Sequence, residues 1–189
     1  MKKPVIFLFA FLCLNIVVSG QIKFPPPDKS PMDVCYFPDN YPMLKVQNKA
    51  NELPACRILY SRPMKNGRQV YGELVEYGKV WRLGANEATE LDLYKDVRIG
   101  DKKLKKGRYS MFAIPFLDKW TIIINRDTDV WGAFVYDASK DIIRMDVRTE
   151  KLSEPSEAFT MFFDKGKNNN ANLIIAWDNI KTSIPFSFN

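Results

Sequence analysis

The sequence predicts an all-β protein: a single antiparallel β-sandwich or jelly roll, with a closed barrel as the main alternative. Three observations support this fold class. About nine short runs alternate between apolar and polar residues with a period of two, and clusters of glycine, asparagine and aspartate separate the runs. No stretch of a dozen residues has a clear helical period, so we expect at most one or two short helices. Many short strands at turn-sized spacings are typical of sandwiches and jelly rolls.

Residues 1–20 are expected to be an export signal. The segment has a positively charged start, an apolar run over residues 5–18 and small residues just before Gln21. The run is shorter than the ~20 residues that span a membrane, and no second apolar run follows it. We therefore expect cleavage near Gln21, export to a periplasm or the exterior, and a soluble mature chain without a membrane span.

Residues 21–54 are expected to form an extended, proline-rich arm ahead of a β-sandwich domain over residues 55–189. Six of the twelve prolines lie between Lys23 and Pro42, and their fixed φ angle and missing N–H group prevent a regular helix. Aromatic side chains in the same stretch would dock the arm on the domain surface. No internal repeat and no second domain boundary is visible.

Two cysteines, Cys35 and Cys56, remain after removal of the signal. In an oxidising compartment such a pair is expected to form a disulfide. The bridge would close a loop of about 20 residues and contribute roughly 3 kcal/mol. The alternative is that the two cysteines are small buried hydrophobic residues.

Strand-like runs follow one another from Cys56 to the C-terminus, and Gly100-Asp101 is expected to make one of the tight turns between them. A short helix could occupy residues 69–77, and an asparagine-rich turn at 168–170 should close a late hairpin. The expected strands are 56–61, 88–94, 97–99, 102–104, 107–115, 119–125, 141–149, 157–163, 172–177 and 181–186.

Several classes of chemistry are disfavoured by composition. The chain has no histidine, which removes the commonest general base and metal ligand, so neither a metal nor another cofactor is expected. The formal charge of +6 is spread along the chain, so we expect no nucleic-acid partner. What remains is carboxylate chemistry, as in a glycosidase. The carboxylates to consider are Glu73, Glu76, Glu87, Glu90, Asp137 and Asp178.

The segment from Tyr60 to Glu90 is the strongest candidate for a site. It concentrates arginine, glycine and tryptophan, and arginine presents a planar fork of donors that suits carboxylates and phosphates. In one interpretation its polar residues converge on a polar, anionic or glycan ligand; in the other, the arginines pair with nearby glutamates and backbone carbonyls and only hold the segment in place. The candidate ligand-binding residues are Arg62, Arg68, Trp81, Arg82, Asn86 and Glu87.

The four tryptophans divide into two groups. Trp120 and Trp177 lie inside apolar strands and are expected in the core. Trp81 and Trp131 lie beside glycine-containing loops and are the better candidates for a ligand site.

An ordered set of motifs in the chain resembles a known family. The motifs are YSRPxxNGRxxYGELVxYGKVWRLGANEAT, GRYSMFAIP, DKWTIIIN, WGAFVYD and NLIIAWDN with a later SIPF. Together they closely resemble the domain of unknown function 2911 family of exported bacterial proteins of the Bacteroidetes type, over residues 30–186. The resemblance implies a single exported domain and brings no activity, cofactor or catalytic residue.

The leading hypothesis is a non-enzymatic, exported module that binds a polar, anionic or glycan ligand through the Tyr60–Glu90 segment. A hydrolase that acts on saccharides through two carboxylates is the first alternative. A structural or partner-binding protein of the envelope, docking through a sheet edge or the proline-rich arm, is the second. The oligomeric state is left open.

Overall fold

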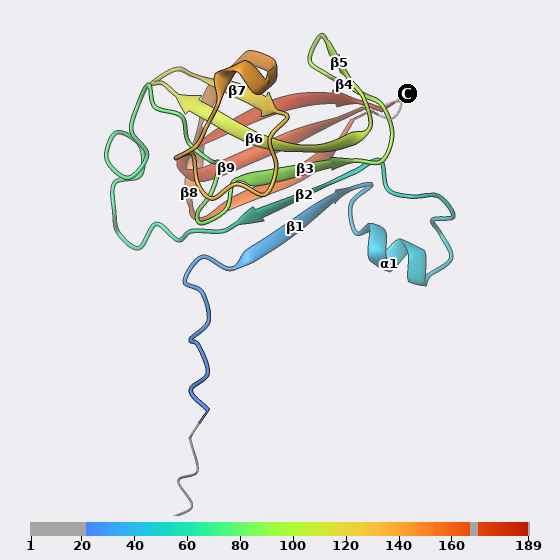
Figure 1. Cartoon of the computed structure of the whole chain (residues 1–189), viewed down its shortest axis with the longest axis horizontal. Coiled ribbons are helices and arrows are strands. Elements are labelled where there is room, and N and C mark those ends of the chain that lie inside the picture. The colour runs from blue at the N-terminus through green and yellow to red at the C-terminus, as the bar shows by residue number, and fades with distance from the viewer. Residues whose placement is uncertain (1–21, 167–169, 189) are drawn as a thin grey trace, which may run out of the picture.

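The computed structural model describes residues 22–166 and 170–188, so the expected signal and most of the asparagine-rich turn lie outside the described residues. Within these ranges no helix is long and apolar enough to cross a membrane. The elements in chain order (Figure 1) are β1 (Met32–Phe37), α1 (Tyr41–Val46), β2 (Cys56–Ser61), β3 (Thr89–Leu93), β4 (Val97–Ile99), β5 (Lys102–Leu104), β6 (Gly107–Pro115), β7 (Lys119–Asn125), the 3₁₀ turn η1 (Ala138–Lys140), β8 (Asp141–Lys165) and β9 (Asn170–Ser187).

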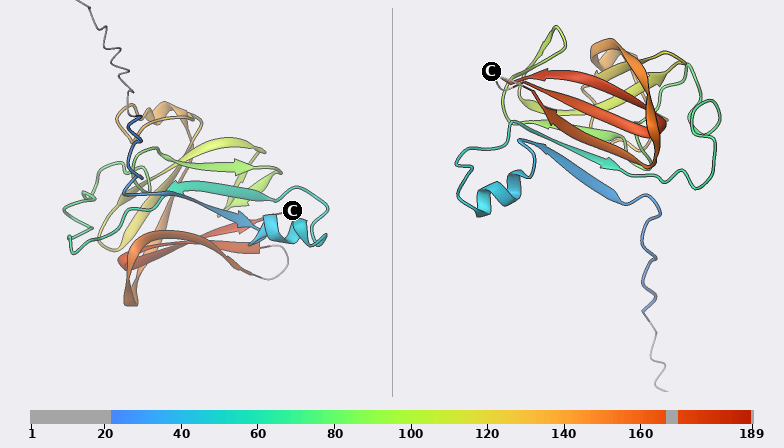
Figure 2. Two further views of the ribbon diagram at one scale, coloured as in Figure 1. Left: turned by 90° about the horizontal axis from the view of Figure 1, so that it is seen from below. Right: turned by 180° about the vertical axis from the view of Figure 1, so that it is seen from behind.

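The strands form one antiparallel sheet in the order β1-β2-β3-β6-β7-β8-β9-β4-β5. The long strand β8 pairs with β7 up to Arg148 and with β9 from Thr149 onward, and the pairing is irregular on either side of Ser156. Bulges bend a strand, so the sheet turns over on itself along β8. Figure 2 shows the result as two layers, with β1, β2, β3 and β6 in one and β9 in the other. The all-β antiparallel prediction is confirmed, and the two layers belong to one continuous open sheet.

The core lies between the two layers. Alternate residues of β6 and β7, such as Met111 and Ile122, face residues such as Leu173 of β9 across it. Trp120 and Trp177 are buried there, as expected. A second, small apolar cluster lies on the opposite face of β6 and β7, around Ala88, Phe112 and Ile123. The chain that covers this second cluster is the loop between β7 and η1.

Most strand predictions are confirmed, and β2, β6 and β7 have the expected bounds. The four last predicted runs merge in pairs into β8 and β9. A polar stretch with Pro155 separates the first two runs, and the structure places it at the bend where the strand is exposed. The predicted helix at residues 69–77 is replaced by turns and a bridge between Tyr71 and Val75.

The proline-rich arm has two parts. Its second part joins the sheet as β1, paired with β2, and then turns through α1. Phe37 and Tyr41 are buried and dock this part, as expected of its aromatic residues. The first part, residues 22–30, has no regular structure and runs away from the sheet, with Phe24 exposed (Figure 1).

The predicted Cys35–Cys56 disulfide is not present, and both thiols are free. In the β1–β2 register Cys35 lies opposite Ile58, and Cys56 lies opposite Phe37. The cysteines are therefore diagonal neighbours, typically about 7–8 Å apart, whereas a disulfide needs Cβ atoms within roughly 4.5 Å. Burial raises the pKa of the Cys35 thiol to about 12 and that of Cys56 well above its ordinary value, so both stay protonated at neutral pH.

Candidate functional site

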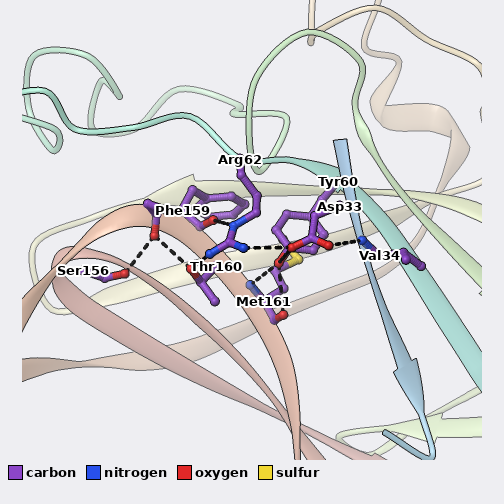
Figure 3. A network of polar contacts seen from close by, with 9 residues as sticks. Asp33, Val34, Tyr60, Arg62, Ser156, Phe159, Thr160 and Met161 are labelled. Carbon is purple, nitrogen blue, oxygen red and sulfur yellow. Dashed lines mark hydrogen bonds and ion pairs between the residues drawn. The ribbon is translucent and has the colours of Figure 1, made fainter. Parts of the chain in front are cut away.

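Arg62 lies at the seam where edge strand β1 meets the second half of β8 (Figure 3). Its Nε donates to the carbonyl of Phe159 at 3.1 Å, and its terminal nitrogens reach Asp33 at 3.0 Å and the hydroxyl of Thr160 at 2.9 Å. The hydroxyl of Tyr60 strengthens the same seam by bonding both the N–H and the carbonyl of Met161. The guanidinium of Arg62 thus joins two sheet edges, and each of its three nitrogens donates to a protein oxygen.

Replacing Arg62 with alanine is expected to lower the free energy of unfolding by about 1–3 kcal/mol, because three seam contacts are lost from a side chain that is 35% exposed. Urea unfolding followed by tryptophan fluorescence measures the change. The matched control is Arg68→Ala, whose loss should stay within about 0.5 kcal/mol. Equal losses in the two variants would mean that Arg62 does not hold the seam.

Arg68 stabilises the turn to which it belongs. Its Nε donates to the carbonyl of Lys65 at 2.9 Å, and a terminal nitrogen donates to the carbonyl of Met64. The side chain is exposed, and the neighbouring Lys65 binds Asp178. Arg68 therefore stabilises a surface turn.

Arg82 is different from both. It is partly buried, its Nε is buried without a hydrogen-bond partner among the described residues, and burial lowers the pKa of its guanidinium. The preceding residue, Trp81, pairs with Ala113 and points into the main core. Because successive residues of an extended segment point to opposite faces, Arg82 points to the outer face, beneath the β7–η1 loop. Its Cδ lies 3.9 Å from where a Cβ at Gly132 would be.

The β7–η1 loop is tied to the Arg82 segment by its backbone. Ala88 donates to the carbonyl of Val130 at 3.0 Å, and Gly132 donates to the carbonyl of Asn86 at 2.9 Å. A bridge between Glu87 and Trp131 lies between these two bonds. The pairing places Asn86 and Glu87 beside Trp131, whose side chain remains 58% exposed. The indole of Trp131 therefore stays open to solvent next to the Arg82 segment.

The five residues Arg82, Asn86, Glu87, Trp131 and Phe134 are referred to below as the Arg82 corner. Phe134 packs its ring against Gly132, where φ is +66° and a Cβ would come within 2.9 Å of that ring. Trp131 and Phe134 are both exposed. The corner therefore combines an unpaired cation with two open aromatic surfaces, and Asn86 and Glu87 add polar groups at its side.

The acids of the covering loop do not neutralise Arg82, because each has another partner. Asp127 binds Lys140 and Asp129 binds Arg108. The carboxylate of Asp137 accepts from the N–H and hydroxyl of Ser139, which lowers the pKa of Asp137. These pairings explain how a partly buried guanidinium can remain unpaired in a loop region that is rich in aspartate.

Trp81 does not join the corner. It is buried among Trp120, Phe159 and Trp177, and its indole N–H donates to the carbonyl of Gly84 at 3.1 Å. A ring enclosed in this way offers no surface for a ligand, whereas Trp131, the other tryptophan that the sequence suggested, has an exposed ring. The exposed Phe134 was not predicted; the only sequence signal for it is the aromatic pair around Gly132 in WGAF.

The other carboxylates are dispersed among different partners. Glu90 receives a bidentate contact from Arg108, with distances of 2.6–2.9 Å, while Asp178 binds Lys65. Glu73 and Glu76 are exposed on the turns that follow Val70. Within the described ranges, no group of three histidine, cysteine, aspartate or glutamate residues is arranged to hold a metal ion.

A small hollow adjoins the corner on the outer face of the sheet. It has a volume of about 190 Å³, and its lining includes Glu87, Ala88, Glu90 and Arg108. Glu87 belongs to both the hollow and the corner. A ligand anchored at Arg82 could therefore extend past Glu87 into this space.

Comparison with known proteins gives one family. The family model described as "Protein of unknown function (DUF2911)" matches residues 42–186, well over half of the chain. No curated protein and no solved structure matches the chain.

Proposed function

Because the chain belongs to the DUF2911 family of proteins of unknown function, we propose a function from its own geometry: it is an exported protein that binds an anionic ligand with a ring, such as an acidic sugar, at the Arg82 corner. The export part of the proposal rests on the charge and apolar pattern of residues 1–20. The binding part rests on Arg82.

The observation that supports the proposal is the buried Nε of Arg82, which has no hydrogen-bond partner among the described residues. A buried donor without a partner typically costs about 1–3 kcal/mol, so most folds supply one. Here Nε of Arg82 has none, and the two other arginines of the segment, Arg62 and Arg68, are bound to protein oxygens. A carboxylate or sulfate on a ligand would pair with the guanidinium charge of Arg82, which has no ion-pair partner in the described part of the chain.

The aromatic part of the corner indicates the rest of the ligand. Sites for small molecules combine apolar surfaces with a few polar groups that fix orientation. The exposed indole of Trp131 offers a flat surface for the apolar face of a sugar ring, and Asn86 and Glu87 can bond hydroxyl groups. An acidic sugar satisfies both halves of this arrangement.

Replacing Arg82 with methionine is expected to leave the free energy of unfolding unchanged or raise it by up to ~1 kcal/mol, because an unsatisfied buried donor is removed. The same variant should lose at least tenfold in affinity for glucuronate, measured by calorimetry, because one charge-assisted contact is worth about 1.5–3 kcal/mol. Glucose serves as the uncharged counterpart of glucuronate and should bind wild type and variant alike.

The matched control is Arg68→Met, which should bind glucuronate as the wild type does. A loss of stability in Arg82→Met as large as that in Arg62→Ala would assign Arg82 a structural role and contradict the proposal. Equal affinity of wild type and Arg82→Met for glucuronate would also contradict it.

A further inference from the structure

A second hollow, of about 420 Å³, lies between β1 and the second half of β8. Its walls include the exposed apolar side chains of Val34, Met43 and Phe162, together with Tyr36. Asp39 lies on its rim. We call this hollow the seam groove. It is an apolar, partly aromatic channel next to a free strand edge, with a carboxylate beside it.

The first part of the N-terminal arm, residues 22–30, has the complementary composition. Ile22 and Phe24 are 76% and 80% exposed, and three consecutive prolines follow at 25–27. Lys23 and Lys29 have no ion-pair partner in the described part of the chain, and neither does Asp39 of the groove. The arm leaves apolar surface in solvent, although the seam groove could bury it.

We propose that the seam groove binds the arm of a second copy of this chain, so that two copies exchange arms around a two-fold axis. Proline-rich segments are already extended, lose little entropy on binding and dock in aromatic-lined grooves. Phe24 would pack against Phe162 and Met43, and the lysines of the arm would approach Asp39. The exchange is reciprocal, as an isologous dimer requires.

The direction of the arm favours a second copy over the groove of its own chain. The arm joins β1 at Met32, and β1 then runs along the groove away from that point. To enter its own groove, the arm would have to reverse at Pro31. The chain bends at Lys29 and Ser30, and the arm beyond this bend runs outward from the sheet, as Figure 1 shows. Nine residues in a polyproline conformation reach about 28 Å, enough to extend into a neighbouring molecule.

Sedimentation equilibrium of protein purified after expression of the full chain tests the proposal. We expect a dimer whose dissociation constant rises roughly ten- to a hundredfold in Phe24→Ser, and by a similar factor in Phe162→Ser, because each removes a buried aromatic contact. The matched control is Phe134→Ser, an exposed phenylalanine outside both surfaces, which should leave the constant unchanged. Phe24 lies outside the sheet, so its variant keeps the fold.

Mixing the two variants separates arm exchange from other contacts. A mixed dimer of Phe24→Ser and Phe162→Ser retains one intact arm in one intact groove, so it should form more tightly than either variant alone. A chain that stays monomeric at every concentration overturns the proposal. So does a dimer that is insensitive to Phe24→Ser, because the arm would then contribute nothing to it.

Discussion

Replacing Gly84 with alanine is expected to lower the free energy of unfolding by about 3–5 kcal/mol, as measured by urea denaturation. Gly84 has a φ of +140°, a region that side chains rarely adopt, and a Cβ there would lie 2.7 Å from the carbonyl oxygen of Ser61. That oxygen belongs to the backbone of β2, so it cannot move aside cheaply. The carbonyl of Gly84 also accepts the indole N–H of Trp81, so displacing this loop would disturb the core as well.

Gly67 provides the control for this prediction. Its φ is +70°, and a Cβ at this position would meet nothing within 4 Å. Gly67→Ala should therefore cost only the backbone term, roughly 1 kcal/mol. The difference between the two variants isolates the contact with Ser61. Similar losses would show that Gly84 is required only for its backbone angle.

The fold was largely predictable from the sequence because its strands carry local signals. Alternation in the runs of β6 and β7 and the turn at Gly100-Asp101 marked these elements correctly. β1 was missed because its six residues lie among prolines, and its partner β2 is brought to it by tertiary structure. The continuity of β8 was missed for a related reason: the polar stretch around Pro155 resembles a loop locally, and pairs with β9 at Lys151 and Ser156 hold it from both ends.

The site was predictable only in part, because the roles of the arginines depend on distant residues. The partners of Arg62 are Asp33, Phe159 and Thr160, which lie 29 to 98 positions away in the sequence. Arg82 has no acidic partner among the described residues because Arg108 and Lys140 form ion pairs with aspartates of the β7–η1 loop, and no local sequence pattern reveals these pairs. The sequence could thus identify a segment rich in hydrogen-bond donors. Which of its arginines lacks a protein partner depends on the tertiary contacts of the folded sheet.

The tryptophans show the same dependence on tertiary structure. Trp81 and Trp131 both lie beside glycine-containing loops, so the sequence alone does not distinguish a buried ring from an exposed one. In the structure the side chain of Trp81 is only 7% exposed. Its ring centroid lies 5.2–6.1 Å from the centroids of three other aromatic rings between the layers. It leaves Trp131 58% exposed on the outer face. One ring thus belongs to the core, and the other is available to a ligand.

Replacing Trp81 with alanine is therefore expected to lower the free energy of unfolding by about 3–5 kcal/mol, because it leaves a cavity in the aromatic core and removes the partner of the Gly84 carbonyl. Trp131→Ala, the matched control, should change stability by less than about 1 kcal/mol and should weaken glucuronate binding instead. Urea unfolding and calorimetry on the same two variants measure both effects. If Trp131→Ala destabilised the fold as much as Trp81→Ala, the exposed indole would be needed for folding, and its assignment to the ligand would lose its basis.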